Sequence, residues 1–475
     1  MAERVLIEHL EFVLTADEEN TVLTDAAILV EDGSIADLGP TDQVAPRHPD
    51  ARRVSGRNRG AVPGLIDTHV HLSETLSRAA FPDVLSTRAW VFHWAKPFYA
   101  HVSEDDEYVS ALLSATEMLR AGTTCFLDMG AQTDAGTVVR AVEEAGLRGV
   151  TGRHAADRKP ERLPPGWTEE MAEHHFFPDA DTALRALEEF WRRFHGAAGG
   201  RIRCWINIEG KEPCSLELHV GARALAERLG VGTTYHLATS LEEAELSEQR
   251  YGAWPITRVA RAGGLGPNLV LAHAVAVRDE EVALLAEAGT GVAFCPSSSL
   301  KLAKGATSIG RYPEMLSSGV RVTLGTDGVS ASGNLNLLRQ VHLVAGLFKD
   351  ARRDPALVGG RQAFRMATLE AARALRWDDE IGSIEVGKRA DLVLFDLNHP
   401  EWVPYTDPLQ ALVWSATSAS VAETWVEGRP LYREGRVLTV DEAALREEAR
   451  ARGRAIRRRA GLDRADVPVT TDLYA

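Results

Sequence analysis

The chain has 475 residues, with 53 Lys and Arg against 68 Asp and Glu, which gives a formal net charge of −15. A field of this sign repels phosphate, so the composition argues against a nucleic acid or an anionic membrane as partner. The contents of 45% apolar and 25% charged residues are typical of globular proteins, and no apolar run approaches the ~20 residues needed to span a bilayer. The first residues, MAERVLIEHL, carry charge where a signal peptide needs apolar side chains, so we expect a cytoplasmic protein.

The two ends of the chain have a similar pattern. Residues 1–62 contain short apolar runs separated by turn signals such as Asp32-Gly33, which favours antiparallel strands. The pattern returns in residues 380–440, which begin near GSIEVGKRADLVLFDL. We predict that both segments build one small β-sandwich and that residues 441–475 form a helical tail. The tail sequence REEARARGRAIRRRAG alternates charges, as is typical of a solvated or subunit-facing helix.

Residues 63–379 alternate short apolar runs with amphipathic stretches, a pattern typical of β-strand and α-helix units on a parallel sheet. Eight such units predict an α/β fold, namely a (β/α)8 barrel of the TIM type. The predicted strands are GLIDTHV (64–70), TTCFLDM (123–129), LRGVTGR (147–153), IRCWINI (202–208), GTTYHLA (232–238), NLVLAHA (268–274), GVAFCPS (291–297) and RVTLGTDG (321–328).

Polar residues that can bind a metal stand at the predicted carboxyl ends of four strands. His69 and His71 end the first strand, His236 the fifth and His273 the sixth, while Asp327 ends the eighth. Barrels of this type carry their active sites at this end, and residues i and i+2 of a strand project from the same face. Each residue alone has a structural explanation, as a core histidine or a turn cap. Together they predict a site for zinc or a similar divalent ion.

Several motifs occur in an order that resembles the amidohydrolase superfamily, in its branch of chlorotriazine hydrolases and adenosine-type and guanine-type deaminases. They are PGLIDTHVHL, LAHAV, CPSSSLKLAKG, GTDGVSASGNLNLL and GSIEVGKRADLVLFDL. The resemblance implies hydrolysis at an amide or amidine-like carbon of a small molecule, by one divalent ion: Zn²⁺, or else Fe²⁺, Co²⁺ or Mn²⁺. It also implies a homo-oligomer, because members of this branch commonly form one.

The resemblance further implies roles for five residues. The metal ligands would be His69, His71, His236 and Asp327. Asp327 would also be catalytic, since a carboxylate beside the metal-bound water can accept its proton and pass it to the leaving group. The second catalytic residue would be His273, which can hydrogen-bond the group that becomes anionic.

One position departs from the family's deaminases. Their strand-five histidine is followed three residues later by a glutamate that protonates a ring nitrogen, whereas the sequence HLATS places Thr239 there. Threonine cannot act as that acid, and we expect Glu242 and Glu243 to face solvent. A carbonyl carbon needs no ring protonation. The departure therefore favours hydrolysis of an amide, urea, carbamate or thiocarbamate in a fairly apolar molecule, similar to the phenylurea and thiocarbamate hydrolases.

Two other functions stay open at this point. The first is a deaminase or dechlorinase of an N-heterocycle, such as a triazine, a pterin or a purine-like ring, that uses another acid. The second is a non-catalytic assembly protein with the same barrel. Such proteins typically lose metal ligands, and all five positions are present in this chain.

A second departure follows the predicted fourth strand. The family's deaminases usually carry a loop like PHAPYTCS, whereas this chain has NIEGKEPCS, with Lys211 near the strand end. In binuclear members a carboxylated lysine on this strand bridges two metal ions, so Lys211 is a candidate for a second-metal site. The simpler expectation is a loop lysine in water and a single metal ion.

Other candidates could contact the substrate. Arg153 ends the third predicted strand, where its guanidinium can bind a carbonyl or carboxylate, or form a structural pair. The segment RAWVFHWAKPFYAHV places Trp90 and Trp94 either in an apolar substrate cavity or in a core helix. The pair His174 and His175 is expected at the surface.

Overall fold

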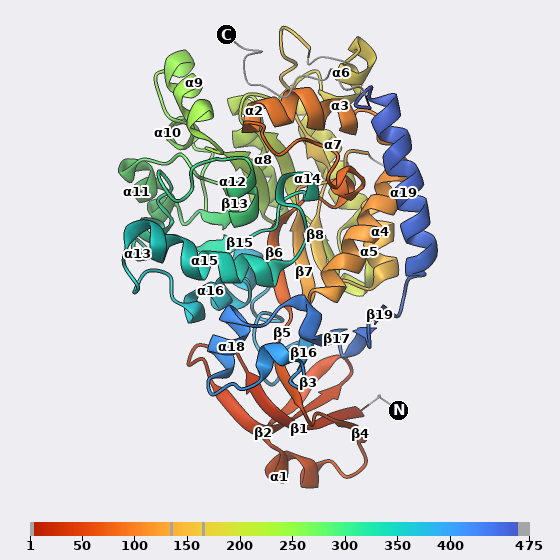
Figure 1. The fold of residues 1–475 in the computed structure, drawn as a ribbon. Helices are drawn as coiled ribbons and strands as arrows, with labels where there is room; N and C mark the ends of the chain where they lie inside the picture. Colours follow the sequence, from red (N-terminus) through yellow and green to blue (C-terminus); the bar gives the residue numbers. More distant parts are fainter. Residues whose placement is uncertain (1–3, 134–135, 164–166, 464–475) are drawn as a thin grey trace.

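The structure is a computed structural model that describes residues 4–133, 136–163 and 167–463. Strands from both ends of the chain lie together at one end of the molecule, and the long central segment forms a barrel beside them (Figure 1). Within the described ranges, we find no helix with the length and apolar character needed to cross a membrane. Residues 464–475 of the predicted tail lie outside the described part.

The terminal sheet joins the two ends of the chain through β5 and β16, which pair antiparallel with Leu392 opposite Pro63. Its strand order is β19-β18-β17-β16-β5-β1-β2-β3, with β4 paired to β1. Side chains from both ends, including Ile28 and Trp425, share a small apolar core. This arrangement confirms the predicted fold of the termini, whereas the exact domain boundaries stay a prediction. The strands are β1 (Arg4–Leu14), β2 (Val22–Glu31), β3 (Ser34–Pro40), β4 (Arg52–Ser55), β5 (Arg59–Pro63), β16 (Leu392–Asp396), β17 (Val421–Val426), β18 (Arg429–Arg433) and β19 (Arg436–Val437).

All eight predicted barrel runs contain parallel strands. Those at the third and fourth positions are interrupted, and their pieces pair in two arcs, β10-β8-β7-β6 and β15-β14-β13-β12-β11-β9. Because parallel strands are covered on both faces, they give the continuous apolar runs that made them predictable. The strands are β6 (Leu65–Val70), β7 (Thr123–Asp128), β8 (Gly149–Thr151), β9 (His154–Ala155), β10 (Ile202–Cys204), β11 (Ile206–Gly210), β12 (Thr233–Leu237), β13 (Leu269–His273), β14 (Gly291–Phe294) and β15 (Val322–Leu324).

Contacts between the first and last strands close the barrel. The Thr68 hydroxyl donates a hydrogen bond to the carbonyl of Leu324 at 2.9 Å. Beyond the strand end, the Asp327 amide donates to the carbonyl of His69 at 2.8 Å. The predicted TIM-type barrel is therefore confirmed, and its closure places two of the candidate metal-binding residues side by side.

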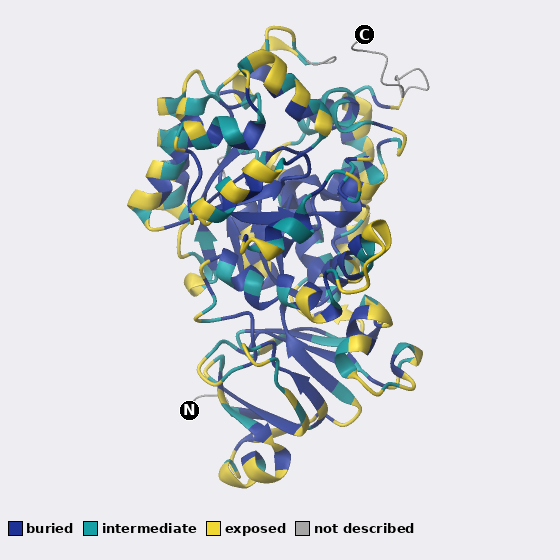
Figure 2. Cartoon of the chain, turned by 90° about the vertical axis from the view of Figure 1, so that its left-hand side faces the viewer, coloured by how far each residue is buried: buried dark blue, intermediate teal, exposed yellow. Residues whose placement is uncertain are grey.

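Helices surround the barrel, with buried faces toward the strands and exposed faces outward (Figure 2). Ser103 caps the first long helix in a reciprocal capping box with Asp106. The main covering helices are α4 (Glu104–Arg120), α5 (Thr137–Ala145), α7 (Ala180–Phe194), α8 (Leu216–Leu229), α9 (Leu241–Tyr251), α10 (Pro255–Arg261), α11 (Asp279–Ala288), α13 (Tyr312–Ser317), α15 (Leu337–Arg352), α16 (Gly360–Met366) and α17 (Leu369–Ala374).

The Arg-rich tail forms α19 (Glu442–Arg459), which lies along α4 at one side of the barrel (Figure 1). Arg452 and Arg459 pair with Asp106 at 2.9 and 3.0 Å. One face of this helix therefore packs on the same chain, while the remaining arginines face outward.

A buried ion pair fastens the barrel to the terminal sheet. Arg148, immediately before β8, places Nε 2.9 Å from Oδ2 of Asp391, and the side chains are 1% and 4% exposed. Asp391 also accepts a hydrogen bond from the Glu427 amide at 2.8 Å. The guanidinium lies 5.1 Å from the ring centre of Trp377. Each charge therefore has partners, as a buried charge requires.

Candidate active site

Four imidazoles and one carboxylate meet at the carboxyl end of the barrel. They come from β6, from the position after it, from β12 and β13, and from the turn after β15: His69, His71, His236, His273 and Asp327. Ligand atoms within two subsets, His69–His236–His273 and His69–His71–Asp327, all lie within 4.8 Å of one another. Both His273 and Asp327 have positive φ, at 75° and 65°, a strained conformation that gathers at functional sites. The structure thus brings together the five residues that the sequence singled out.

The cluster has the geometry of an ion site. The Nε2 atoms of His71 and His236 face each other at 3.2 Å, and Oδ1 of Asp327 lies 3.5 Å from Nε2 of His71. Both ring nitrogens of His69 are buried without a hydrogen-bond partner. Buried polar atoms without partners are rare in folded proteins. Converging imidazoles with a carboxylate are the donor set that zinc prefers, so these residues fit a divalent metal ion.

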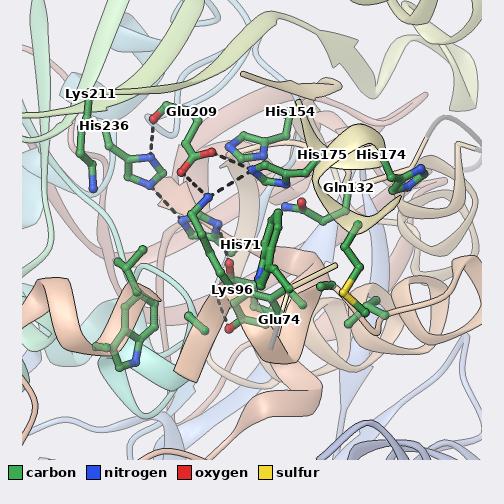
Figure 3. Close-up of a pocket in the computed structure, with 18 of the residues that line it drawn as sticks. His71, Glu74, Lys96, Gln132, His154, His174, His175, Glu209, Lys211 and His236 are labelled. Atoms are coloured by element: carbon green, nitrogen blue, oxygen red, sulfur yellow. Dashed lines mark hydrogen bonds and ion pairs between the residues drawn. The ribbon is translucent and has the colours of Figure 1, made fainter. Parts of the chain in front are cut away.

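Hydrogen bonds behind the cluster orient its rings (Figure 3). The carbonyl of Glu209 lies 2.9 Å from Nδ1 of His236, and since a carbonyl can only accept, Nδ1 carries the proton and Nε2 keeps its lone pair. Glu74 lies 3.2 Å from Nδ1 of His71 and accepts a hydrogen bond from Tyr99 at 2.9 Å. Such contacts fix the tautomer of metal-binding histidines. Burial, with the charge of Lys211 next, holds the pKa of His236 well below its ordinary value, which keeps this ring neutral.

A cavity of about 570 Å³ opens above the cluster. Of the predicted substrate contacts, Trp90, Arg153 and Lys211 line it. Trp94 does not: it is 5% exposed and packs against Phe81, with ring centres 6.1 Å apart. The core explanation for Trp94 is therefore the correct one.

The cavity wall contains a group of ion-paired side chains that the sequence analysis missed. Glu209 binds Lys96 at 2.9 Å through Oε1 and His175 at 3.0 Å through Oε2 (Figure 3). The predicted surface position of His175 is therefore wrong, whereas His174 is exposed. Helix α6 (Glu169–His175) brings His175 over the cavity, which no local pattern indicates.

The structure also corrects the expected surroundings of Thr239 and Glu243, which follow the fifth barrel strand. The amide and hydroxyl of Thr239 donate to Oε2 of Glu243 at 2.8 and 2.7 Å, and the Ala238 amide donates to Oε1 at 2.8 Å. Glu243 is 8% exposed, so it does not face solvent as expected. Its side chain folds back from the first turn of α9 to bind the loop that precedes this helix. Thr239 thus serves a structural bond and does not line the cavity above the cluster.

Two lysines flank the cluster. Lys304 was not singled out from the sequence, although it lies within CPSSSLKLAKG; it is buried, with Nζ 3.4 Å from Nδ1 of His273 and 3.9 Å from Oδ2 of Asp327. Burial lowers the pKa of Lys304. Lys211 follows β11 with φ of 58°. Burial holds the pKa values of His236 and His273 well below their ordinary value, and the charge of Lys211 adds to this effect. Its role in a second-metal site stays a prediction.

Comparisons with known proteins agree with this architecture. A model of the amidohydrolase family matches residues 61–431, and one of an imidazolonepropionase-like composite domain of bacteria matches residues 26–51. The 5-methylthioadenosine/S-adenosylhomocysteine deaminase of Symbiobacterium thermophilum is 36% identical over 434 residues, which cover 91% of this chain and 94% of that protein. The 5'-deoxyadenosine deaminase of Methanosarcina acetivorans is 33% identical over 440 residues, covering 92% and 95%.

Solved structures show the same fold. A zinc-bound adenosine deaminase from Xanthomonas campestris superposes with a TM-score of 0.85 at 28% identity, covering 96% of this chain and 98% of that one. Atrazine chlorohydrolase from Arthrobacter aurescens, in complex with zinc, gives 0.82 at 24% identity, covering 95% and 99%, and at that identity shares the fold alone. The predicted resemblance and the predicted divalent-metal cofactor are confirmed. The chain belongs to the amidohydrolase family and is a hydrolase that acts on carbon–nitrogen bonds.

Proposed function

We propose that the protein removes an amino group hydrolytically from an N-heterocycle, with an adenosine-type nucleoside as the first candidate substrate. The proposal is carried by the cluster of four imidazoles and Asp327 at the base of the cavity. Relatives named as nucleoside deaminases match more than nine-tenths of the chain, which supports this chemistry. Heterocycle deamination was the second expectation from the sequence, and the relatives favour it over carbonyl hydrolysis.

Each residue of the cluster has a defined task in this proposal. His69, His71, His236 and Asp327 would hold one divalent ion, which supplies hydroxide at neutral pH. Asp327 accepts the proton of the attacking water and returns it to the departing amino group, which leaves as ammonia. His273 and Lys304 place N–H groups on the same side of the cavity, where they stabilise negative charge that develops on the ring.

A second candidate function rests on Thr239. The hydroxyl of Thr239 is bonded to Glu243, so this position presents no acid to the cavity. Hydrolysis of an amide, urea or carbamate needs no ring protonation, and the same cluster would serve it. The small-molecule cavity fits both reactions.

That the protein is a homo-oligomer and cytoplasmic stays a prediction. Light scattering can check the first property and cell fractionation the second.

A substrate panel separates the two functions. Zinc-loaded protein is given adenosine, 5'-deoxyadenosine, 5-methylthioadenosine, an aminotriazine and a pterin, and in parallel N-aryl amides, ureas and carbamates that release an arylamine. We expect ammonia together with an oxo-substituted ring from the first group. Release of arylamine alone would overturn the proposal in favour of carbonyl hydrolysis. The variant Asp327→Asn, prepared in the same way, controls for contaminating deaminases.

A further inference from the structure

A second cavity, of about 900 Å³, adjoins the catalytic cavity and is here called the basic groove. Lys96 and Lys211 line both cavities, so the two spaces meet at these side chains. Among the described residues, three glutamates line the groove, Glu161, Glu212 and Glu243, against eight Lys and Arg. This excess of positive charge stands out in a chain whose net charge is −15. The basic residues are Arg88, Lys96, Arg158, Lys159, Arg162, Lys211, Arg250 and Arg258.

Carboxylates within the protein neutralise only part of this charge. Lys96 pairs with Glu209, Lys159 pairs with Glu169, and Arg88 lies 3.7 Å from Glu242. The carboxylate of Glu243 is bound to Thr239 and two backbone amides. Within the described part of the chain, the remaining five cations have no carboxylate within 4.0 Å: Arg158, Arg162, Lys211, Arg250 and Arg258.

Three of these arginines converge on one side chain, Tyr251, at the end of α9. Arg158 donates a hydrogen bond from Nη1 to the Tyr251 hydroxyl at 3.1 Å, and the guanidinium carbon of Arg258 lies 3.8 Å from the ring centre. Burial alone would raise the pKa of Tyr251, but Arg158, Arg250 and Arg258 together hold it below its ordinary value.

The arginines also repel one another. Burial, and the charge of Arg158, lower the pKa of Arg258, while Tyr251, Glu212 and Glu217 oppose that effect. Planar guanidinium groups that are held close together, stacked on an aromatic ring and left without a counter-ion, offer the forked donors that bind carboxylate or phosphate. Among the described residues, Glu212 and Glu217 offset part of this charge, and the remaining charge is complementary to a ligand anion.

We propose that the basic groove is an anion-binding subsite for the substrate: a carboxylate or phosphate lies among Arg158, Arg250 and Arg258 while the reacting ring occupies the catalytic cavity. Lys211 stands at the junction, where it contacts the part of the substrate that connects the two. The position of the ring rests on the proposed function, whereas the anion subsite rests on the groove alone. The substrate class is therefore an anionic derivative of the heterocycle.

Calorimetry tests the subsite without any reaction. Zinc-loaded protein is titrated at low salt with inorganic phosphate and, separately, with glutarate. The anion with the lower Kd shows whether the subsite prefers a phosphate or a carboxylate. We expect one site per chain, and a Kd at least tenfold higher in the double variant Arg158→Gln/Arg258→Gln. Arg339→Gln is the control, because Arg339 is an exposed arginine of α15 that lines neither the groove nor the catalytic cavity.

Two results would overturn the proposal: neither anion binds, or both bind equally well to the double variant, which would assign the binding to the metal cluster. Far-ultraviolet circular dichroism establishes that the variants are folded. The titration involves no turnover. A lack of activity on the substrate panel would therefore not contradict the anion subsite, and a lack of anion binding would not contradict the proposed deamination.

Discussion

The two ends of the barrel differ in the partners that their buried polar side chains have. At the end that rests on the terminal sheet, Arg148 and Asp391 bind each other at 2.9 Å, and Asp391 also holds the Glu427 amide. At the other end, the buried ring nitrogens of His69 make no hydrogen bond, and Lys304 is buried beside His273. The first arrangement is complete as it stands, whereas the second is completed only by something that binds there.

The backbone conformation also differs between the two ends of the barrel. His273 and Asp327 adopt positive φ at the catalytic end, where strain is tolerated if it orients reacting groups. Arg148 lies next to a regular strand and is buried between Asp391 and the ring of Trp377. The ion pair beside the terminal sheet therefore has the features of a structural contact, and the histidine cluster has those of a functional site. The following changes test that distinction, from the largest expected effect to the smallest.

Replacing His69 by Ala should abolish activity and leave the fold intact. The ring makes no hydrogen bond that the folded chain needs, but it belongs to two of the three groups of residues that could hold an ion. We expect zinc content well below one per chain and a fall in kcat/KM beyond the ~100-fold that loss of an outer partner costs. Mass spectrometry for metal and a kinetic assay measure this, with His342→Ala as control, because His342 is exposed and does not line the cavity. Unchanged zinc content in His69→Ala would contradict the assignment.

Replacing Arg148 by Met should have the reverse effect. The variant leaves Asp391 buried without its ion pair, which lowers the free energy of unfolding by about 3–5 kcal/mol. The kcat of the protein that remains folded should not change, because Arg148 lies at the far end of the barrel from the cluster. Urea unfolding and active-site-normalised kinetics measure both quantities. A large fall in kcat at unchanged stability would show that the two ends are not independent.

Replacing Lys304 by Met removes the buried cation beside His273. We expect kcat to fall by about 100-fold, the effect of removing one donor to developing charge, with zinc content retained. Lys304→Arg keeps the charge and should recover part of the rate. If Lys304→Met instead lost its zinc, the role of this lysine would be to support the cluster and not the reaction.

Replacing Thr239 by Ala should change kcat by less than about threefold, since the side chain does not line the catalytic cavity. The variant loses the hydroxyl bond to Glu243, which should lower the free energy of unfolding by about 1.5–3 kcal/mol. Thermal unfolding and ammonia release measure the two effects. A much larger fall in kcat would bring Thr239 into the reaction and revive the carbonyl-hydrolase alternative.

Sequence patterns predicted the parts of the molecule that depend on periodicity and strand ends. The eight apolar runs located the barrel strands, and the residues at their carboxyl ends located the candidate cluster, because strand ends converge in a closed barrel.

The remaining features depend on long-range placement. His175 reaches Glu209 only because α6 folds over the cavity, and Lys304 meets His273 only because the segment after β14 returns to the end of the neighbouring strand β13. Glu243 was expected in water because its helix is polar, but its side chain folds back to bind Thr239. The basic groove likewise collects arginines from three separate segments, so its charge could not be found by scanning for basic runs.

Zinc titration of the metal-free enzyme tests the central claim most directly. Ammonia release from the best substrate of the heterocycle panel is followed as zinc is added back. We predict no release without metal and a rate that rises in proportion to zinc until about one ion is bound per chain. Full ammonia release from metal-free protein would contradict the claim that this cluster is a metal-dependent deamination site.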